Sequence, residues 1–179
     1  MSRLIPLANW TGTPRATVIF VHGLGGHPYT TWTHTQADPA ALWPIWLAED
    51  IPGLAVWSLG YDSPMSEWTG TAMPLLDEAA NILRTLIHEP GLQHGPLAFV
   101  CHSLGGLLVK QVLRDAKEQD EDSAIASLFD RTRHVTFIAT PHNGSAKATL
   151  LDWLGVLFRR SDAVRGLVAV TMSGLRPAR

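Results

Sequence analysis

Four short apolar segments alternate with longer stretches of helical spacing, and this alternation most strongly constrains the fold. The apolar segments are residues 17–21, 54–59, 97–101 and 134–139, which are rich in Val, Ile, Phe and Leu and end at turn-forming residues. Such runs are typical of strands that are buried on both faces of a sheet. Strands that alternate with helices predict an α/β fold, with a mostly parallel sheet and helices on both of its faces.

Three of the intervening stretches have the pattern of helices. Residues 104–117 place apolar side chains on one stripe and charged side chains opposite, as an amphipathic helix does. Residues 74–88 begin with a proline, which suits a first helical turn, and the Pro-Gly pair at 90–91 would end that helix. Residues 40–49 are expected to form a third, shorter helix.

Length and composition favour one globular domain over residues 1–179. The chain is 46% hydrophobic and 17% charged, which argues against disorder, and its net charge of -2 gives no basic surface for nucleic acid. One cysteine and an amino terminus without a signal-peptide pattern predict a cytoplasmic protein. No apolar run approaches the ~18 residues of a spanning helix, so any membrane contact is expected to be peripheral.

The central chemical feature is Ser103, which lies between the third apolar segment and the helix predicted at 104–117. A serine at a sharp turn from strand to helix is typical of a nucleophile elbow. Such a turn requires small residues two positions before and after the serine; Gly105 meets this requirement, whereas Cys101 stands where glycine is usual. The alternative is that Ser103 only caps the helix and that the glycines allow close packing.

A glycine-rich turn, HGLGG at residues 22–26, directly follows the first apolar segment. Its backbone N–H groups could point into a site and bind an oxyanion. In that role the N–H groups of Leu24 and Leu104 would converge on the same oxygen, with the positive end of a helix dipole behind Leu104. The alternative, a phosphate-binding loop, is disfavoured because the turn has no P-loop lysine.

A third segment, ATPHNGS at residues 139–145, follows the fourth apolar segment and so emerges at the same edge of the sheet. Together with HGLGG, Thr31-Trp32 and CHSLGG, it resembles the α/β-hydrolase superfamily, and more narrowly the lipase-like serine esterases related to GPI inositol-deacylases. The resemblance spans about residues 17–145 and implies a partial α/β-hydrolase fold.

The resemblance also implies roles for individual residues. Ser103 looks like the nucleophile, and Leu24 and Leu104 look like the residues that donate backbone N–H groups to the oxyanion. His22 and His102 occupy flanking motif positions rather than the position of the base. No metal or cofactor is expected, and the implied substrate is a small-molecule or lipid ester.

A serine nucleophile needs a base, and in this fold the acid and the histidine follow the serine in the chain. After Ser103 the histidines are His134 and His142. His134 should lie at the amino end of its strand, far from Ser103. His142 follows its strand at the correct edge and is the candidate base, with Asp152 and Asp162 as the candidate acids; the alternative, which the resemblance implies, is that His142 serves the structure of its loop. We therefore expect the domain to lack the C-terminal part that bears the acid and the histidine, which another chain could supply.

The function predicted from these residues is hydrolysis of a hydrophobic carboxylic ester through an acyl-enzyme on Ser103. The alternative is a catalytically inactive hydrolase-like module that binds a lipid or protein partner. Residues 150–160 are apolar nearly all round and end in two arginines, which suits a lid or a helix on a membrane surface. The alternative, which we favour, is that missing downstream strands and helices would normally cover these apolar residues.

Overall fold

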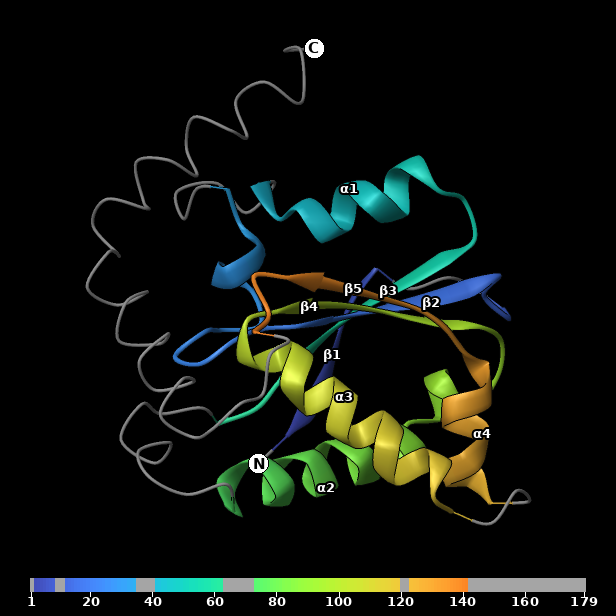
Figure 1. Ribbon diagram of the computed structural model, residues 1–179. Helices are drawn as coiled ribbons and strands as arrows, with labels where there is room; N and C mark the ends of the chain where they lie inside the picture. Colours follow the sequence, from blue (N-terminus) through green and yellow to red (C-terminus); the bar gives the residue numbers. More distant parts are fainter. Residues whose placement is uncertain (1, 9–11, 35–40, 63–72, 120–122, 142–179) are drawn as a thin grey trace.

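A computed structural model describes residues 2–8, 12–34, 41–62, 73–119 and 123–141. Within these ranges the chain forms one sheet with helices packed against both of its faces (Figure 1). The α/β class, and the helices on both faces, are as the sequence predicts.

The sheet has five described strands: β1 (Arg3–Ala8), β2 (Ala16–Val21), β3 (Leu54–Gly60), β4 (Leu97–His102) and β5 (Thr132–Ile138). Their order across the sheet is β1-β3-β2-β4-β5. Strand β2 is central and pairs in parallel with β3 and β4, and β4 pairs in parallel with β5, whereas β1 is antiparallel to β3. The four predicted strands are confirmed, and the sheet has the mostly parallel arrangement expected of part of an α/β-hydrolase fold.

Strand β1 was not predicted from the sequence. The strand contains Pro6, a residue that usually interrupts strands, and none of its six residues is fully buried. Proline is tolerated on an edge strand, because the side of the strand that faces solvent needs no N–H for pairing. Here the pairing of β1 with β3 shifts register between Pro6 and Ala8, so the strand depends on its partner rather than on its own pattern.

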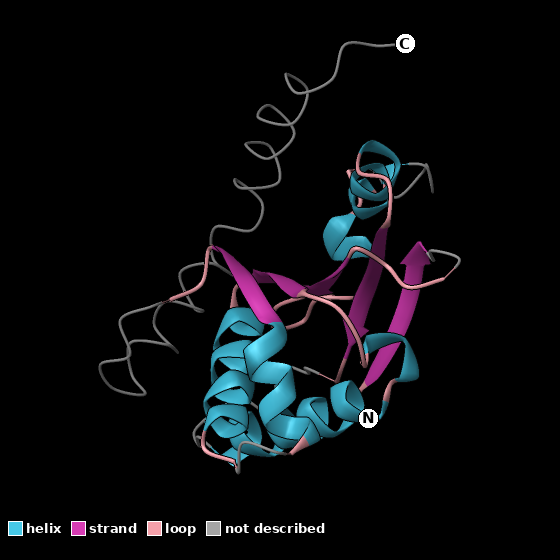
Figure 2. Cartoon of the chain, turned by 90° about the vertical axis from the view of Figure 1, so that its right-hand side faces the viewer, coloured by secondary structure: helices cyan, strands magenta, loops and turns pink. Residues whose placement is uncertain are grey.

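The described α-helices are α1 (Trp43–Asp50), α2 (Met73–His88), α3 (Leu104–Lys117) and α4 (Ala124–Arg131). Helix α1 lies on one face of the sheet, and α2, α3 and α4 lie on the other (Figures 1 and 2). The predicted bounds of α3 are confirmed, and α2 ends at His88, before Pro90, as predicted. None of these helices is long and apolar enough to cross a bilayer.

The structure corrects two of the helix predictions. The helix predicted at 40–49 begins only at Trp43, because Leu42 is extended and forms an isolated bridge with Thr33. Helix α4 was missed because it passes directly into β5, with no turn-forming residue between Arg131 and Thr132 to mark its end. Its one local signal is Ser123, whose hydroxyl accepts a hydrogen bond from Ala126 N–H and so caps the helix.

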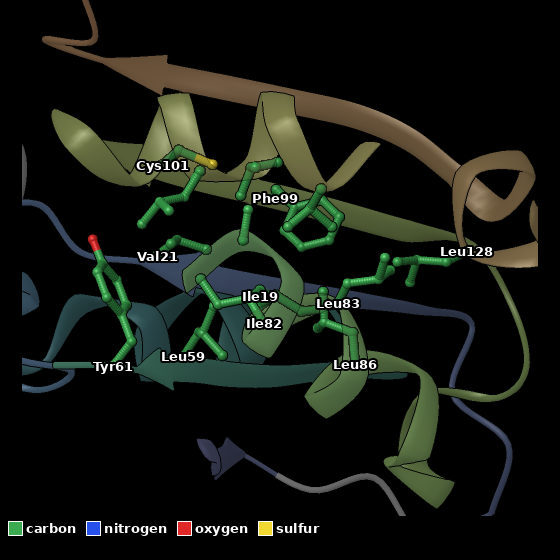
Figure 3. Close-up of a cluster of buried hydrophobic side chains, with 14 of the residues drawn as sticks. Ile19, Val21, Leu59, Tyr61, Ile82, Leu83, Leu86, Phe99, Cys101 and Leu128 are labelled. Atoms are coloured by element: carbon green, nitrogen blue, oxygen red, sulfur yellow. The ribbon is translucent and has the colours of Figure 1, made fainter. Parts of the chain in front are cut away.

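Apolar side chains form a core on each face of the sheet. The larger core lies between the sheet and α2, α3 and α4, and includes Ile19, Leu59, Phe99 and Leu108 (Figure 3). The smaller core lies beneath α1 and contains Phe20, Trp32 and Val56 among others. Because alternate side chains of β2 enter opposite cores, the central strand is fixed from both sides.

One expectation about the strands is wrong. Strand β5 was predicted to be buried on both faces, but it lies at the edge of the described sheet. Arg133, His134 and Ile138 are exposed, and no residue of β5 is fully buried. The apolar composition of this segment therefore does not reflect burial within the described part of the chain.

Candidate active site

Ser103 occupies the turn between β4 and α3. Its φ is 51° and its ψ is -120°. Only Ser103 and Ala139 among the described non-glycine residues have a positive φ. Such a backbone conformation costs about 1–3 kcal/mol and persists only where the surrounding structure imposes it. Ser103 thus has the strained geometry of a nucleophile elbow, at the carboxyl edge of the sheet.

Two glycines allow the first turn of α3 to approach the neighbouring loops. A Cβ placed on Gly105 would collide with the carbonyl oxygen of His22 and with the backbone of Val21. A Cβ placed on Gly106 would overlap the hydroxyl of Thr140. The glycine expected two residues after the serine is therefore required by backbone contact with the end of β2.

Cys101, at the position where glycine is usual, is accommodated inside the larger core. Its side chain is fully buried among apolar residues on the face covered by α2 and α3 (Figure 3). The sulfur therefore lies within the core, and Ser103 still adopts the elbow conformation. Burial raises the pKa of the Cys101 thiol, so the group stays protonated and acts as a small apolar side chain.

This burial predicts a pH dependence of stability. An unfolded cysteine ionises near pH ~8.5, whereas the raised pKa keeps the folded Cys101 thiol protonated above that pH. The protonated Cys101 thiol therefore contributes fully to the free energy of unfolding below pH ~8.5. This contribution falls as the pH rises, by about 1 kcal/mol up to pH ~9.5. Urea unfolding at pH 7.5 and 9.5 should show this fall in the parent but not in Cys101→Ala. An equal fall in both proteins would contradict the assignment.

The glycine-rich segment forms a turn that lies against the elbow. Gly26 N–H donates to the Gly23 carbonyl at 3.0 Å, and Gly25 has a φ of 62°. A residue at this turn position needs a positive φ, which glycine adopts without a steric penalty. A Cβ placed on Gly23 would lie 2.8 Å from Ser103 Cβ. The peptide that bears Leu24 N–H is thus adjacent to Ser103.

His22 holds this turn from inside the protein. Its Nδ1 lies 2.9 Å from the Gly23 carbonyl oxygen, and because a carbonyl only accepts, Nδ1 carries the proton. Burial lowers the pKa of His22, which keeps the ring neutral. The ring stacks on Tyr61 with 4.3 Å between centroids, and the Tyr61 hydroxyl donates to the His22 carbonyl at 2.7 Å. These contacts fit a structural role, in keeping with its flanking motif position.

The end of β5 holds Ser103 from the other side. Ser103 N–H donates to the Ile138 carbonyl at 2.9 Å, and the Thr140 hydroxyl donates to the Ser103 carbonyl at 3.1 Å. Between them Ala139 has a φ of 50°. The glycine-rich turn, the elbow and the described start of the third segment, residues 139–141, therefore meet at one edge of the sheet, as predicted.

The other three histidines considered in the sequence lie in different places. His134 pairs with Ala98 in the amino-terminal half of β5, and its exposed ring contacts Thr136, so it lies away from the elbow as expected. His102 is partly buried, its ring lies 6.5 Å from that of Trp32, and burial lowers its pKa. His142 lies outside the described residues, as do Asp152, Asp162 and residues 150–160.

Two polar residues at this edge were missed from the sequence. Tyr61 follows β3 and supports the carbonyl of His22, and Thr140 supports the carbonyl of Ser103. The signal for Tyr61 was its place just after an apolar strand. Thr140 lay inside a recognised motif, but the motif gave it no role.

Comparison with known sequences places this chain in a family. Residues 13–175 match the family described as "Putative serine esterase (DUF676)". Human Protein SERAC1 is 32% identical over 152 residues, which cover 75% of this chain and 23% of the relative. The Danio rerio Protein SERAC1 is 33% identical over 154 residues, which again cover 75% of this chain and 23% of the relative. The chain thus spans less than a quarter of the length of these curated relatives.

Similar solved structures include a lipase-esterase related protein from Clostridium acetobutylicum ATCC 824, with 15% identity, a TM-score of 0.46 and coverage of 78% of this chain and 47% of that chain. Another is esterase B from Lactobacillus rhamnosis, inhibited by a tributyrin phosphonate, with 20% identity and a TM-score of 0.41. The match covers 86% of this chain and 48% of that chain. The family match takes in Ser103 and all three segments singled out in the sequence, and the chain belongs to the family described as "Putative serine esterase (DUF676)".

Proposed function

We propose that this chain hydrolyses carboxylic esters with Ser103 as the nucleophile. The observation that carries the proposal is the strained backbone of Ser103, which the turn after β2 and the segment after β5 hold from both sides. A serine in this conformation presents its hydroxyl at the edge of the sheet where ligands bind. Membership of a serine esterase family supports the same chemistry.

The reaction would proceed through two tetrahedral intermediates. Ser103 Oγ forms a bond to the acyl carbon while its proton passes to a base, and the carbonyl oxygen becomes an oxyanion. Collapse of this intermediate breaks the bond to the alcohol, which leaves with the proton from the base. Water then attacks the acyl-enzyme by the same route, releases the acid and restores Ser103.

Backbone N–H groups of Leu24 and Leu104 are the proposed donors to the oxyanion. Leu24 directly follows Gly23, which abuts Ser103, and Leu104 is the first residue of α3. The first N–H groups of a helix have no acceptor within the helix, so the Leu104 N–H is available to a ligand. The positive end of the α3 dipole adds to the favourable potential at that point.

His142 is the proposed base. It follows Pro141, one residue beyond Thr140, whose hydroxyl binds the Ser103 carbonyl. The closeness of Thr140 to the elbow supports this choice over His134, whose backbone pairs with Ala98 farther down the sheet. Asp152 and Asp162 stay the predicted acids.

A hydrophobic acyl or alcohol group is the proposed substrate feature. Ile138, whose carbonyl binds Ser103 N–H, leaves 40% of its surface exposed at this edge, and the partly buried Leu24 lies nearby. The alternative function, an inactive module that binds a lipid or protein partner, depends on residues 150–160 and has no support among the described residues. The cytoplasmic setting and the peripheral membrane contact also stay predictions.

The test is hydrolysis of p-nitrophenyl acetate, butyrate and octanoate by the purified chain. We expect kcat/KM to rise with acyl length, because longer chains bury more apolar surface. In His142→Ala, kcat should fall on the order of 100-fold, whereas the matched His134→Ala should keep parent activity. A folded parent that hydrolyses none of these esters above the rate in buffer would contradict the proposed function, and equal activity of the two histidine variants would remove His142 as the base.

A further inference from the structure

The carbonyl of Ser103 and the N–H of Leu104 belong to the same peptide unit. This carbonyl accepts hydrogen bonds from Gly106 N–H at 3.1 Å and from the Thr140 hydroxyl at 3.1 Å. In a planar trans peptide the C=O and the N–H point in opposite directions. Whatever fixes the direction of the Ser103 carbonyl therefore also fixes the direction of the Leu104 N–H.

The glycine-rich turn repeats this arrangement. The Gly23 carbonyl shares a peptide unit with Leu24 N–H, and it accepts hydrogen bonds from Gly26 N–H at 3.0 Å and from His22 Nδ1 at 2.9 Å. Both peptides that bear a proposed oxyanion donor thus have a carbonyl that accepts one hydrogen bond from a backbone N–H three residues along the chain and another from a side chain.

The placement of Thr140 requires two unusual features of the backbone. Ala139 has a φ of 50°, a conformation that costs an alanine about 1–2 kcal/mol. Gly106 has no Cβ, and a Cβ there would overlap the Thr140 hydroxyl. Thr140 itself is buried, with 9% of its surface exposed. A strained turn and a glycine together make room for this one hydroxyl at the carbonyl of Ser103.

We propose that Thr140 is a positioning residue of the oxyanion hole, which orients and polarises the Ser103–Leu104 peptide through its hydroxyl. The proposal rests on the proposed function, in which Leu104 N–H binds the oxyanion. A hydrogen bond donated to a peptide carbonyl polarises the peptide and makes its N–H a stronger donor. Because the oxyanion forms only during the reaction, this effect should appear in kcat rather than in KM.

The kinetic test compares three variants. Thr140→Val keeps the shape of the side chain and removes the hydroxyl, Thr140→Ser restores the hydroxyl, and the matched control Thr136→Val removes a threonine hydroxyl from β5 away from Ser103. We expect kcat for p-nitrophenyl butyrate to fall on the order of tenfold in Thr140→Val with KM unchanged, because a whole oxyanion donor is worth 10²–10³-fold. Thr140→Ser should recover most of the rate, and Thr136→Val should match the parent.

A second readout does not depend on activity. Backbone amide NMR of the same proteins reports the Leu104 N–H directly, and its proton resonance should move in Thr140→Val and return toward the parent position in Thr140→Ser. An unmoved Leu104 resonance with an unchanged kcat in Thr140→Val would overturn the proposal and leave the esterase function standing. A fall in kcat/KM that arises only from KM would also overturn it. If the resonance moves but the parent hydrolyses no ester, the positioning of the peptide is upheld and the proposed function fails.

Discussion

Replacing Gly105 with alanine is expected to lower the free energy of unfolding by about 3 kcal/mol, because the new Cβ has no space. Helix propensity alone predicts the opposite, since alanine is favoured over glycine inside a helix by about 0.5–1 kcal/mol. The Cβ would meet the carbonyl oxygen of His22 and the backbone of Val21. Backbone at the end of a central strand cannot move aside as a flexible side chain can. The steric cost of the new Cβ therefore outweighs the gain in helix propensity, and the variant should be strongly destabilised.

Urea unfolding of Gly105→Ala and of the control Gly25→Ala measures this difference. A Cβ on Gly25 would meet no atom within 4 Å, although its φ of 62° is unfavourable for alanine. The control should therefore lose only about 1–2 kcal/mol, from its backbone conformation. If Gly105→Ala is as stable as the parent, α3 does not pack against the end of β2 as the structure shows.

Ser103→Ala and Ser103→Gly are both expected to lower kcat at least 10³-fold, because each removes the oxygen that we propose attacks the ester. Their stabilities should differ, because alanine keeps the Cβ that makes a positive φ unfavourable and glycine does not. Relief of about 1–3 kcal/mol of strain exceeds the entropic cost of glycine, about 0.5–1 kcal/mol. We therefore expect Ser103→Gly to be about 1 kcal/mol more stable than Ser103→Ala.

Thermal unfolding of the two Ser103 variants beside the parent provides the measurement. Ser103→Gly should have the highest Tm of the three proteins despite its loss of activity. Equal Tm values for the glycine and alanine variants would show that no strain is stored at the elbow, and the geometric basis for a nucleophile at this position would be lost.

The sequence predicted the elements whose local signals agree with their place in the fold. Helix α3 was predicted at its observed bounds, because its apolar stripe faces the larger core and a serine and two glycines mark its start. The central strands were predicted because they are buried on both faces and so are apolar throughout. Consequently Ser103 could be placed at the junction of strand and helix without a structure.

Other features depend on contacts that no local pattern records. Within the described sheet, β1 pairs with β3 alone and contains Pro6. Helix α4 passes directly into β5, so no turn-forming residue marks its end. The apolar residues of β5 suggested burial, but the strand lies at the edge of the described sheet. Thr140 binds the carbonyl of a residue far away in the sequence, so its role follows only from the folded geometry.

We propose that Ser103 is an activated nucleophile at the edge of the sheet where the turn after β2 meets the segment after β5. The most direct measurement is to treat the folded parent with a fluorophosphonate probe and to map the adduct by peptide mass spectrometry. We predict a single adduct on Ser103, which is absent in Ser103→Ala and absent after the parent is unfolded in urea. A folded parent that gains no adduct, or an adduct on another serine, would contradict the claim.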